Sequence, residues 1–505
     1  MPRATRLRIL TMVGVALTAA ACDREQSQSL NAAVIGTGEL MLGDPLLPPA
    51  NESQAVLRTN IAQGLVRFDA AGEVEPGLAE RWNVSDDGLS YIFRLQSGEW
   101  PDGRRIMARD VARLLTRMLR ADRDGQTRDA LGAIEEVVAM TERVIEIRLT
   151  APRPNLLQVL AQPELALIRE GVGSGPFAIR KPEAPEPGES AVESDPAAPL
   201  ELMRRFAGID GEPGEREDVR LSTMPAADGI KAFRAGTIDL LLGGTVDDLP
   251  LATGANLDNG VLRFDPVGGL FGLVPAREDG PLAVADVRQL LSQAIDRDAL
   301  IAALKVPGLG PRATVLEGGL GALGTPVQPP WLALPMAERQ SALLIEAERL
   351  FGDTERPSLK VALPPGPGGD MLFARLSADW GLLGIAVERV APGRPADFML
   401  IDAVAPSNSP AWYLRRFRCG NTPICVEEAD EMLAAAREAP VSAQRAALLQ
   451  QAADLMDQAA LFLPLAAPVR WSLVGDRAAA FQENRFARHP LAGMMGQTDT
   501  RGFSP

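Results

Sequence analysis

The side chains that could do chemistry are few in this chain of 505 residues. His489 is the one histidine, so a serine–histidine–aspartate triad would have to be built around that residue alone. Adjacent carboxylates occur at Asp86–Asp87 and Glu427–Glu428, but such pairs at turns and helix starts are normally solvated. No Gly-rich loop ends in Lys-Ser or Lys-Thr, and no histidine–cysteine cluster offers a metal site. We therefore expect a protein that is not an enzyme and uses no metal or cofactor.

The three cysteines divide between two roles. Cys22 follows a basic head and an apolar run from Ile9 to Ala21, which is typical of a secretory signal and too short for a membrane span. Its position after three alanines resembles a bacterial lipoprotein signal, in which the cysteine is acylated; ordinary cleavage nearby is the alternative. In an exported protein, Cys419 and Cys425 more often form a disulfide than a metal site.

Length and composition bound the class of protein. The chain is long enough for two or three domains with their own cores, and its apolar fraction of 46% is that of a globular protein. The formal net charge of −15 would repel nucleic-acid phosphates, so we expect no nucleic-acid partner. The acidity is compatible with a cationic ligand, although surface charge usually serves solubility alone.

The most strongly patterned stretch lies between Gly64 and Leu119. Turn-forming residues divide it into short strands, and Asp86-Asp87-Gly88 marks the reversal of a hairpin. The pattern predicts a strand at 65–68, a short apolar turn at 78–82, hairpin arms at 82–84 and 91–95, and an amphipathic helix that begins at Ala108.

Beyond this stretch, strands alternate with helices, which predicts a mixed sheet of α/β type. Strands are expected at 32–36, 134–140, 144–149, 359–363, 384–390, 397–402 and 462–465. Helices are expected at 54–63, 230–236, 286–297, 343–351, 371–383, 427–439 and 442–458. On the helix at 286–297 we expect Asp286, Arg288 and Asp296 to be solvated, and residues 181–200 are expected to form a hairpin insertion.

Three runs of residues carry a resemblance to a known family. They are Gly-Leu-Ala-Glu-Arg-Trp at 77–82, Ser-Asp-Asp-Gly-Leu-Ser-Tyr-Ile-Phe-Arg-Leu at 85–95, and Gly-x-Trp-x-Asp-Gly-x-x-x-x-Ala-x-Asp-Val at 98–111. Together they resemble the signature of the family 5 extracellular solute-binding proteins of peptide/nickel-type ABC importers. The resemblance implies a type II periplasmic binding protein fold: two lobes with mixed sheets, a hinge, and an extra subdomain in the first lobe. It also implies a structural role for Trp100.

The resemblance implies the following division of the chain. We expect a signal peptide at 1–21, a lipidated tether at 22–31, the core of lobe I at 32–55, 172–262 and 475–505, the extra subdomain at 56–171, and lobe II at 263–474.

Peptide-binding members of the family hold the ligand by strand-like hydrogen bonds and pair its ammonium group with a buried acid. With Pro410 as the reference, the family's tryptophan position is Ala403 here and its acid position is Pro406. Asp402 is the nearest acid that could substitute, and a role as a turn residue at the strand end is the alternative. Trp412 and Tyr413 are the candidate pocket aromatics, with core packing as the alternative.

The resemblance therefore implies a periplasmic receptor that delivers a small peptide or peptide-like solute to an ABC permease and its ATPase. We expect a monomer attached to the membrane through its lipid alone. Asp23 fits the enterobacterial rule for retention at the inner membrane. The alternative is a non-transport sensor or interaction lipoprotein that keeps the fold without the ancestral peptide specificity. Nickel is not expected, because the ligand cluster it needs is missing.

Overall fold

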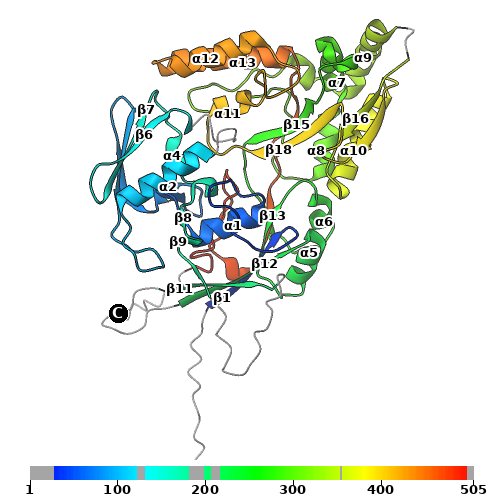
Figure 1. Cartoon of the computed structure of the whole chain (residues 1–505). Helices are drawn as coiled ribbons and strands as arrows, with labels where there is room; N and C mark the ends of the chain where they lie inside the picture. Colours follow the sequence, from blue (N-terminus) through cyan, green and yellow to red (C-terminus); the bar gives the residue numbers. More distant parts are fainter. Residues whose placement is uncertain (1–27, 122–130, 181–197, 206–215, 353–354, 497–505) are drawn as a thin grey trace, which may run out of the picture.

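The computed structural model describes residues 28–121, 131–180, 198–205, 216–352 and 355–496. Its helices and strands form a mixed α/β structure with three larger sheets (Figure 1), as the alternating sequence pattern predicts. Cys22 and most of the predicted hairpin insertion at 181–200 lie outside the described residues. Within the described ranges, no helix is both long and apolar enough to cross a bilayer.

The largest sheet has seven strands in the order β10-β11-β12-β1-β13-β20-β14. Its central strands β12, β1 and β13 are parallel, and both faces of β1 are covered, so Leu30 and residues 32–34 of that strand are apolar and fully buried. Helix α5 packs on this sheet. Helix α1 follows β1 in the chain and lies near the middle of the molecule. The bounds are β1 Gln28–Ile35, β10 Ala178–Ile179, β11 Leu200–Arg205, β12 Arg216–Met224, β13 Leu240–Gly244, β14 Leu262–Phe264, β20 Trp471–Val474, α1 Glu52–Ile61 and α5 Ala226–Arg234.

The second sheet has five strands in the order β17-β16-β18-β15-β19. Along β15, Phe271 and Leu273 face the helices α7 to α10, whereas Leu270 and Val274 face α11 to α13, because successive side chains alternate across a strand. The bounds are β15 Gly269–Pro275, β16 Ser358–Ala362, β17 Ala386–Val390, β18 Phe398–Val404, β19 Leu463–Ala466, α6 Leu249–Thr253, α7 Ala285–Ala294, α8 Arg297–Leu304, α9 Met336–Phe351, α10 Pro367–Gly381, α11 Pro410–Arg415, α12 Glu427–Glu438 and α13 Ser442–Gln458.

A third, four-stranded sheet has the order β4-β5-β7-β6, and α2 packs against it. The predicted hairpin is confirmed, but the predicted turn at 78–82 is wrong, because β4 begins at Ala79 and pairs with β5. Trp100 is buried in this core, with 1% of its surface exposed. The bounds are β4 Ala79–Val84, β5 Ser90–Leu95, α2 Ala108–Ala121, β6 Ile134–Ala139 and β7 Val144–Leu149; the smaller elements nearby are β2 Val66–Phe68, β3 Val74–Pro76, α4 Leu156–Leu160, β8 Ile168–Arg169 and β9 Val172–Gly173.

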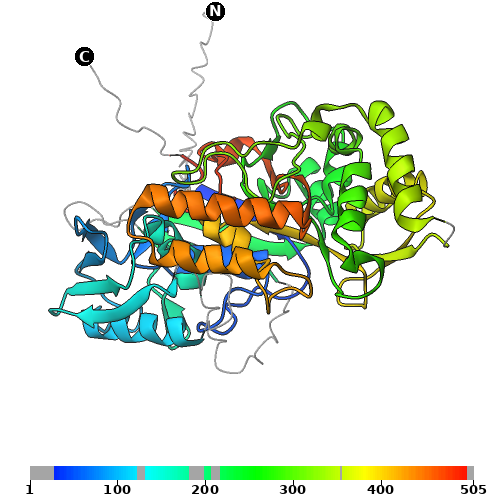
Figure 2. The same cartoon turned by 90° about the horizontal axis from the view of Figure 1, so that it is seen from above.

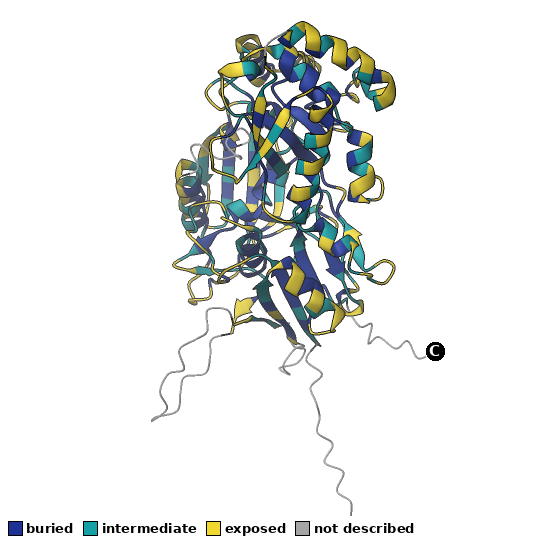
Figure 3. Cartoon of the chain, turned by 90° about the vertical axis from the view of Figure 1, so that its right-hand side faces the viewer, coloured by how far each residue is buried: buried dark blue, intermediate teal, exposed yellow. Residues whose placement is uncertain are grey.

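The chain passes twice between the two largest sheets, first at 265–268 and again at 467–470. These two crossing segments touch, since the backbone N–H of Asp265 donates to the carbonyl of Arg470 at 3.0 Å. After the second crossing, residues 475–496 return along the seven-stranded sheet, where Ala478, Leu491 and Met494 join its core. The exposed positions gather on the outward faces of the helices, and the strands between them are largely buried (Figure 3).

The helix predicted at 286–297 is in fact two helices. It ends at Ala294, and the Asp296 side chain caps α8 by accepting from the N–H of Ala299 at 3.0 Å. The expectation that Arg288 is solvated is also wrong, since only 2% of that residue is exposed. Its guanidinium donates to backbone carbonyls, including that of Leu282 in the turn just before α7. The other predicted helices and strands are confirmed with shifted ends.

A disulfide joins Cys419 and Cys425, whose Cα atoms are 5.0 Å apart. It closes the loop between α11 and α12, and the N–H of Cys419 donates to Asp430 on α12 at 3.1 Å. The two long helices α12 and α13 lie side by side across this face, as the orange helices of Figure 2 show. The bridge therefore fixes where this helix pair begins.

We predict that replacing both cysteines with serine lowers the free energy of unfolding by about 2 kcal/mol, because a short closed loop restricts the unfolded chain only modestly. Urea denaturation with and without a reducing agent measures this change. The reductant should shift the midpoint of the parent protein to that of the variant and leave the variant unchanged. Equal midpoints for parent and variant in the absence of reductant would contradict the prediction.

Candidate functional site

A cavity of about 600 Å³ lies between the two largest sheets. Each sheet contributes the residues at the end of one strand, Gly243–Thr245 at the end of β13 and Asp402–Pro406 at the end of β18. The remaining wall comes from the start of α1, from both crossing segments and from the returning segment at 486–489. Ligand sites in α/β proteins commonly lie in such a crevice at the ends of strands.

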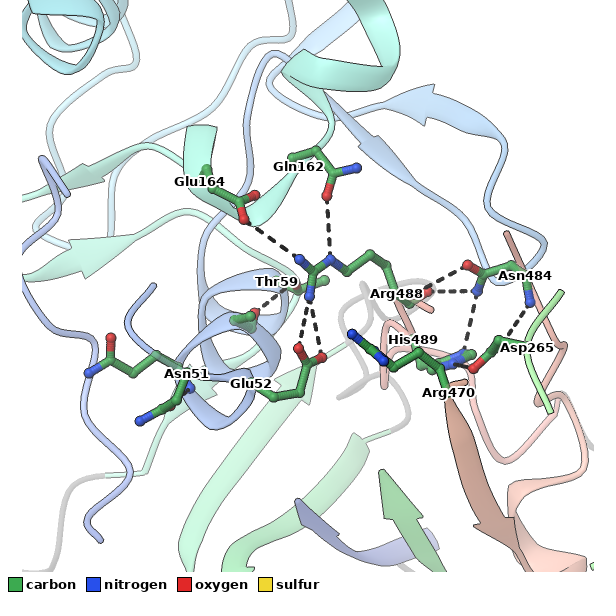
Figure 4. A network of polar contacts seen from close by, with 12 residues as sticks. Asn51, Glu52, Thr59, Gln162, Glu164, Asp265, Arg470, Asn484, Arg488 and His489 are labelled. Atoms are coloured by element: carbon green, nitrogen blue, oxygen red, sulfur yellow. Dashed lines mark hydrogen bonds and ion pairs between the residues drawn. The ribbon is translucent and has the colours of Figure 1, made fainter. Parts of the chain in front are cut away.

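Arg488 organises one wall of the cavity (Figure 4). Its Nη1 donates to Glu52 at 3.1 Å, its Nε lies 3.3 Å from the Gln162 side-chain oxygen, and its Nη2 lies 3.6 Å from Glu164. Burial alone would lower the pKa of Arg488, but the two glutamates together raise it above its ordinary value. The guanidinium is therefore a fixed positive charge between two carboxylates that come from different elements.

Glu164 keeps an unused acceptor at this wall. Its Oε1 faces Arg488, whereas its Oε2 is buried and has no hydrogen-bond partner among the described residues. A buried oxygen of this kind costs free energy until it receives a donor. Glu164 lines the cavity, so a ligand could supply that donor.

The single histidine lies at the opposite side of this network (Figure 4). His489 Nε2 is 3.0 Å from Asp265 of the first crossing segment, and both residues are less than a tenth exposed. The other Asp265 oxygen accepts from the backbone N–H of Asn484 at 2.9 Å. The contact between His489 and Asp265 holds the returning segment against the first crossing segment. The two residues are 224 positions apart in the sequence.

Asp402 lies on the cavity wall and is paired with an arginine. Nη1 of Arg470, in the second crossing segment, donates to both carboxylate oxygens at 2.8 and 3.0 Å. Burial, and then the negative charges of Asp402 and Asp248, raise the pKa of Asp247 to about 6. Asp247 belongs to the turn after β13 and Asp402 to β18, so a carboxylate from each of the two largest sheets lies near enough to influence the other.

The other two predicted pocket residues lie behind the wall. Trp412 and Tyr413 are on α11, are 8% and 0% exposed, and pack with the core beneath α12 and α13. The Tyr413 hydroxyl donates to Glu317, which is also paired with Arg312. Neither aromatic residue lines the cavity, whereas Ala403 and Pro406 do. A ligand-binding role for Asp402, Trp412 and Tyr413 stays a prediction.

The sequence reasoning missed the residues that carry most of the charge in the cavity. Four carboxylates, two guanidinium groups and one imidazole line it: Glu52, Glu164, Asp265 and Asp402, then Arg470 and Arg488, then His489. Of these seven residues the sequence had pointed to Asp402 alone; among the other six, only the rarity of histidine could have drawn attention to one, His489. Among the described residues, no group of three acidic, histidine or cysteine side chains could hold a metal ion.

Three hydrogen bonds join the two sides of the cavity. The side chain of Gln162 donates to the carbonyl of Pro406 at 2.8 Å, and the side-chain oxygen of Gln158 accepts from the N–H of Asn408 at 3.1 Å. On the other flank, the N–H of Gly368 donates to the carbonyl of Asp247 at 2.8 Å. The two walls of the cavity are therefore in direct contact at two edges of the cavity.

The end of β18 also offers backbone groups. β16 pairs with β18 only at Phe398 and Met399, whereas β15 pairs with it as far as Val404. The edge of β18 from Leu400 to Val404 therefore has no neighbouring strand within the described part of the chain. Such an edge can pair with an extended peptide.

Comparison with known proteins gives a consistent result. The model of the bacterial extracellular solute-binding proteins, family 5 middle, matches residues 73–347. The probable di/tripeptide-binding protein 5 of Pseudomonas aeruginosa is 26% identical over 496 residues, which cover 85% of this chain and 88% of that protein.

Solved structures show the fold. The Escherichia coli murein tripeptide binding protein MppA superposes with a TM-score of 0.75 at 16% identity, over 92% of this chain and 97% of its own. Haemophilus influenzae OppA in complex with the peptide RPPGFSPFR gives 0.73 at 15% identity, over 92% and 98%. The expected two-lobed, type II periplasmic binding protein fold is confirmed.

We predict that Gly268→Ala destabilises the protein by about 1–3 kcal/mol. An added Cβ would lie 2.0 Å from a Glu317 oxygen and 3.0 Å from the Tyr413 hydroxyl, at the first crossing between the sheets. Gly310→Ala is the matched control, because a Cβ there meets no atom within 4 Å. Urea denaturation should show a lower midpoint for the first variant only; equal midpoints would contradict the contact.

We predict that Asp247→Asn stabilises the protein at neutral pH and not near pH 4. The folded state raises the pKa of Asp247 to about 6, so it binds the proton more tightly than the unfolded chain, and the parent loses stability as the pH rises from about 4 to about 6. Above that range the variant should be more stable by up to about 2 kcal/mol, since part of the side chain is still solvated.

Thermal unfolding from pH 4.5 to 8 measures this gap, with Asp258→Asn, at an exposed loop position, as the control. The gap between Asp247→Asn and the parent should widen with pH and then stay constant above about pH 7. A gap that is independent of pH would show that the carboxylate is not the cause.

Proposed function

Because the chain belongs to the bacterial extracellular solute-binding proteins of family 5, we propose that it binds a small peptide or peptide-like solute in the cavity between its two largest sheets. The family's members are non-enzymatic components of transport, and this chain is a binding protein, not an enzyme. The observation that carries the proposal is the cavity itself. Its volume of about 600 Å³ lies within the range of small-ligand sites.

The charge of the cavity favours a ligand with an ammonium group. The residues that line it include two more carboxylates than guanidinium groups, in surroundings from which water is partly excluded. Glu164 offers a buried oxygen without a partner, and Asp402 offers a carboxylate already oriented by Arg470. We propose that the N-terminal ammonium of a peptide binds between these two acids.

The backbone of the ligand has a matching partner in β18. Its edge from Leu400 to Val404 lies where the strand runs into the cavity wall, so an extended peptide could continue the five-stranded sheet. Ala403 and Pro406 are small residues at this wall, which leaves room for ligand side chains. We propose that backbone pairing supplies affinity, while the acids select the terminus.

We propose that the expected domains are lobes that move relative to each other. The seven-stranded sheet would be the core of lobe I, the five-stranded sheet the core of lobe II, and residues 56–171 the extra subdomain. The crossing segments at 265–268 and 467–470 would then be the hinge. Binding would favour closure, because ligand contacts on both walls can form only when the lobes approach.

We further propose that the closed form delivers its ligand to an ABC permease and its ATPase. Cys22 would carry the lipid that holds a monomer at a membrane, with Asp23 directing it to the inner membrane. Cys22 lies outside the described residues, and mass spectrometry of the mature N-terminus would identify the acylated cysteine. Trp412 and Tyr413 would act through the wall that they support, because neither lines the cavity.

One observation favours a second function. Ala403 and Pro406 stand where peptide-binding members carry a tryptophan and the ammonium-binding acid. A lipoprotein that kept the fold without that specificity could act as a sensor or interaction protein instead of a transport receptor. The two functions differ in whether peptides bind at all.

We predict that di- to tripeptide pools raise the midpoint of thermal unfolding, by mass action on the folded state, and that N-acetylated forms of the same peptides do so at least tenfold less effectively. Glu164→Gln and Asp402→Asn should each weaken binding about tenfold or more, because each removes a negative charge from the ammonium site. Asp258→Asn is the control and should bind as the parent does.

Two results would count against these proposals in different ways. A flat response to every peptide pool would remove peptide binding and favour the sensor function. Peptide binding that is unchanged in both acid variants, or by acetylation, would keep the receptor function and remove the ammonium site.

A further inference from the structure

A second hollow, of about 180 Å³, lies apart from the central cavity and shares no lining residue with it. It lies on the seam between residues 152–156, which are the loop before α4 and the first residue of that helix, and the helices α11 to α13. We call it the seam groove. Much of its wall is apolar, with Leu156, Leu323, Pro410, Leu433 and Leu449.

The charge of the seam groove is opposite to that of the whole chain. Its lining residues include four arginines and no acidic residue, in a protein whose formal net charge is −15. The arginines come from both sides of the seam: Arg153 from the loop before α4, and Arg418, Arg437 and Arg445 from the region of α11 to α13.

The local contacts of these arginines hold them at the groove. Nε of Arg418 lies 3.7 Å from Asp430, and Nη2 of Arg445 donates to the carbonyl of Ala439 at 2.8 Å. Nε of Arg445 is buried and has no hydrogen-bond partner among the described residues. A buried donor without an acceptor costs free energy, which an anionic oxygen in the groove would recover.

We propose that the seam groove binds an amphipathic monocarboxylate, with its apolar chain against the leucines and its carboxylate against the arginines. Arginine presents a planar pair of donors that matches a carboxylate. The volume is close to the roughly 150 Å³ of an apolar protein cavity known to hold a benzene ring, so the chain must be short. A chain of about eight carbons is the probe that we choose.

The groove is coupled to the central cavity by one stretch of chain. Ala405 and Pro406 line the cavity, and Ser409, Pro410 and Ala411 line the groove. Between them, the backbone N–H of Asn408 donates to the side-chain oxygen of Gln158, and this bond crosses the seam. An occupant of the groove touches both sides of the seam at once, so it binds the closed arrangement better than an open one and shifts the protein toward closure.

The test uses the full protein and sodium octanoate below its micelle concentration. Octanoate should raise the thermal midpoint saturably, whereas acetate, which lacks the chain, and octanol, which lacks the charge, should not. Arg437→Glu and Ala446→Phe should weaken the response at least tenfold, because the first reverses a charge at the groove and the second fills it. Arg437 is exposed, so Arg437→Glu should leave folding intact. It therefore tests the site even if Ala446→Phe disturbs folding.

Arg113→Glu on α2 is the matched control, since this arginine is also exposed and does not line the groove. Asp402→Asn changes the central cavity and should leave the thermal shift with octanoate unchanged. That result would place octanoate binding outside the central cavity. The proposal is overturned if octanoate gives no saturable shift, if the control weakens it equally, or if Asp402→Asn abolishes it. Binding only to vesicles of an anionic lipid, without a response to octanoate, would also overturn it.

The coupling has its own readout. Small-angle scattering should show a smaller radius of gyration with saturating octanoate than without it, and Ala446→Phe should remove that difference. Octanoate that binds without changing the radius would overturn the closure step.

Discussion

The structure depends on the two places where the chain crosses between its largest sheets. Each crossing carries a charged residue into the cavity, Asp265 in the first and Arg470 in the second, and a backbone hydrogen bond joins the two segments. A charge in such a partly dry place needs a partner. Asp265 finds His489 on the returning segment, and Arg470 finds Asp402 at the end of β18, so the pairings of the crossings also determine which other segments line the cavity.

The same requirement explains how distant parts of the chain are held together elsewhere. Arg288 and Arg297 are buried beneath the five-stranded sheet, and both donate to backbone carbonyls, Arg297 to that of Pro464 at 2.7 Å. Burial lowers the pKa of Arg297 to about 9, which still leaves it charged at neutral pH. These bonds connect α7 and α8 to the segment that leads into the second crossing. The position of that crossing is therefore fixed by these helices as well as by the ion pairs in the cavity.

Local patterns in the sequence predicted much of the fold and little of the site. The hairpin turn at Asp86-Asp87-Gly88 and the helices α12 and α13 depend on turn chemistry and helical periodicity, which neighbouring residues determine. The first half of β4, residues 79–81, was predicted as a turn because its pairing with β5, and not its own pattern, makes it part of the strand. Arg288 was expected in solvent because its carbonyl partners lie as far as 172 residues along the chain.

For the candidate site, the sequence pointed to a segment that does line the cavity, but not to the direction in which its side chains point. Asp402 lies on the wall, whereas α11 turns Trp412 and Tyr413 into the core, and nothing in the local pattern distinguishes these faces. The acids at 52, 164 and 265 come from three separate segments, so only folding brings them together.

The distribution of acids over several segments affects how much the proline at position 406 would change ligand binding. Where a receptor depends on one buried acid, its loss removes the charge that recognises the ligand. In this cavity the negative charge comes from four carboxylates in separate segments, and two guanidinium groups offset only part of it. In a partly dry cavity, charges a few ångströms apart act on a ligand together. If the proposed ammonium site is right, proline at 406 would remove one contact and leave the preference for a cation, and selectivity would depend on the shape left by Ala403 and Pro406 more than on any single ion pair.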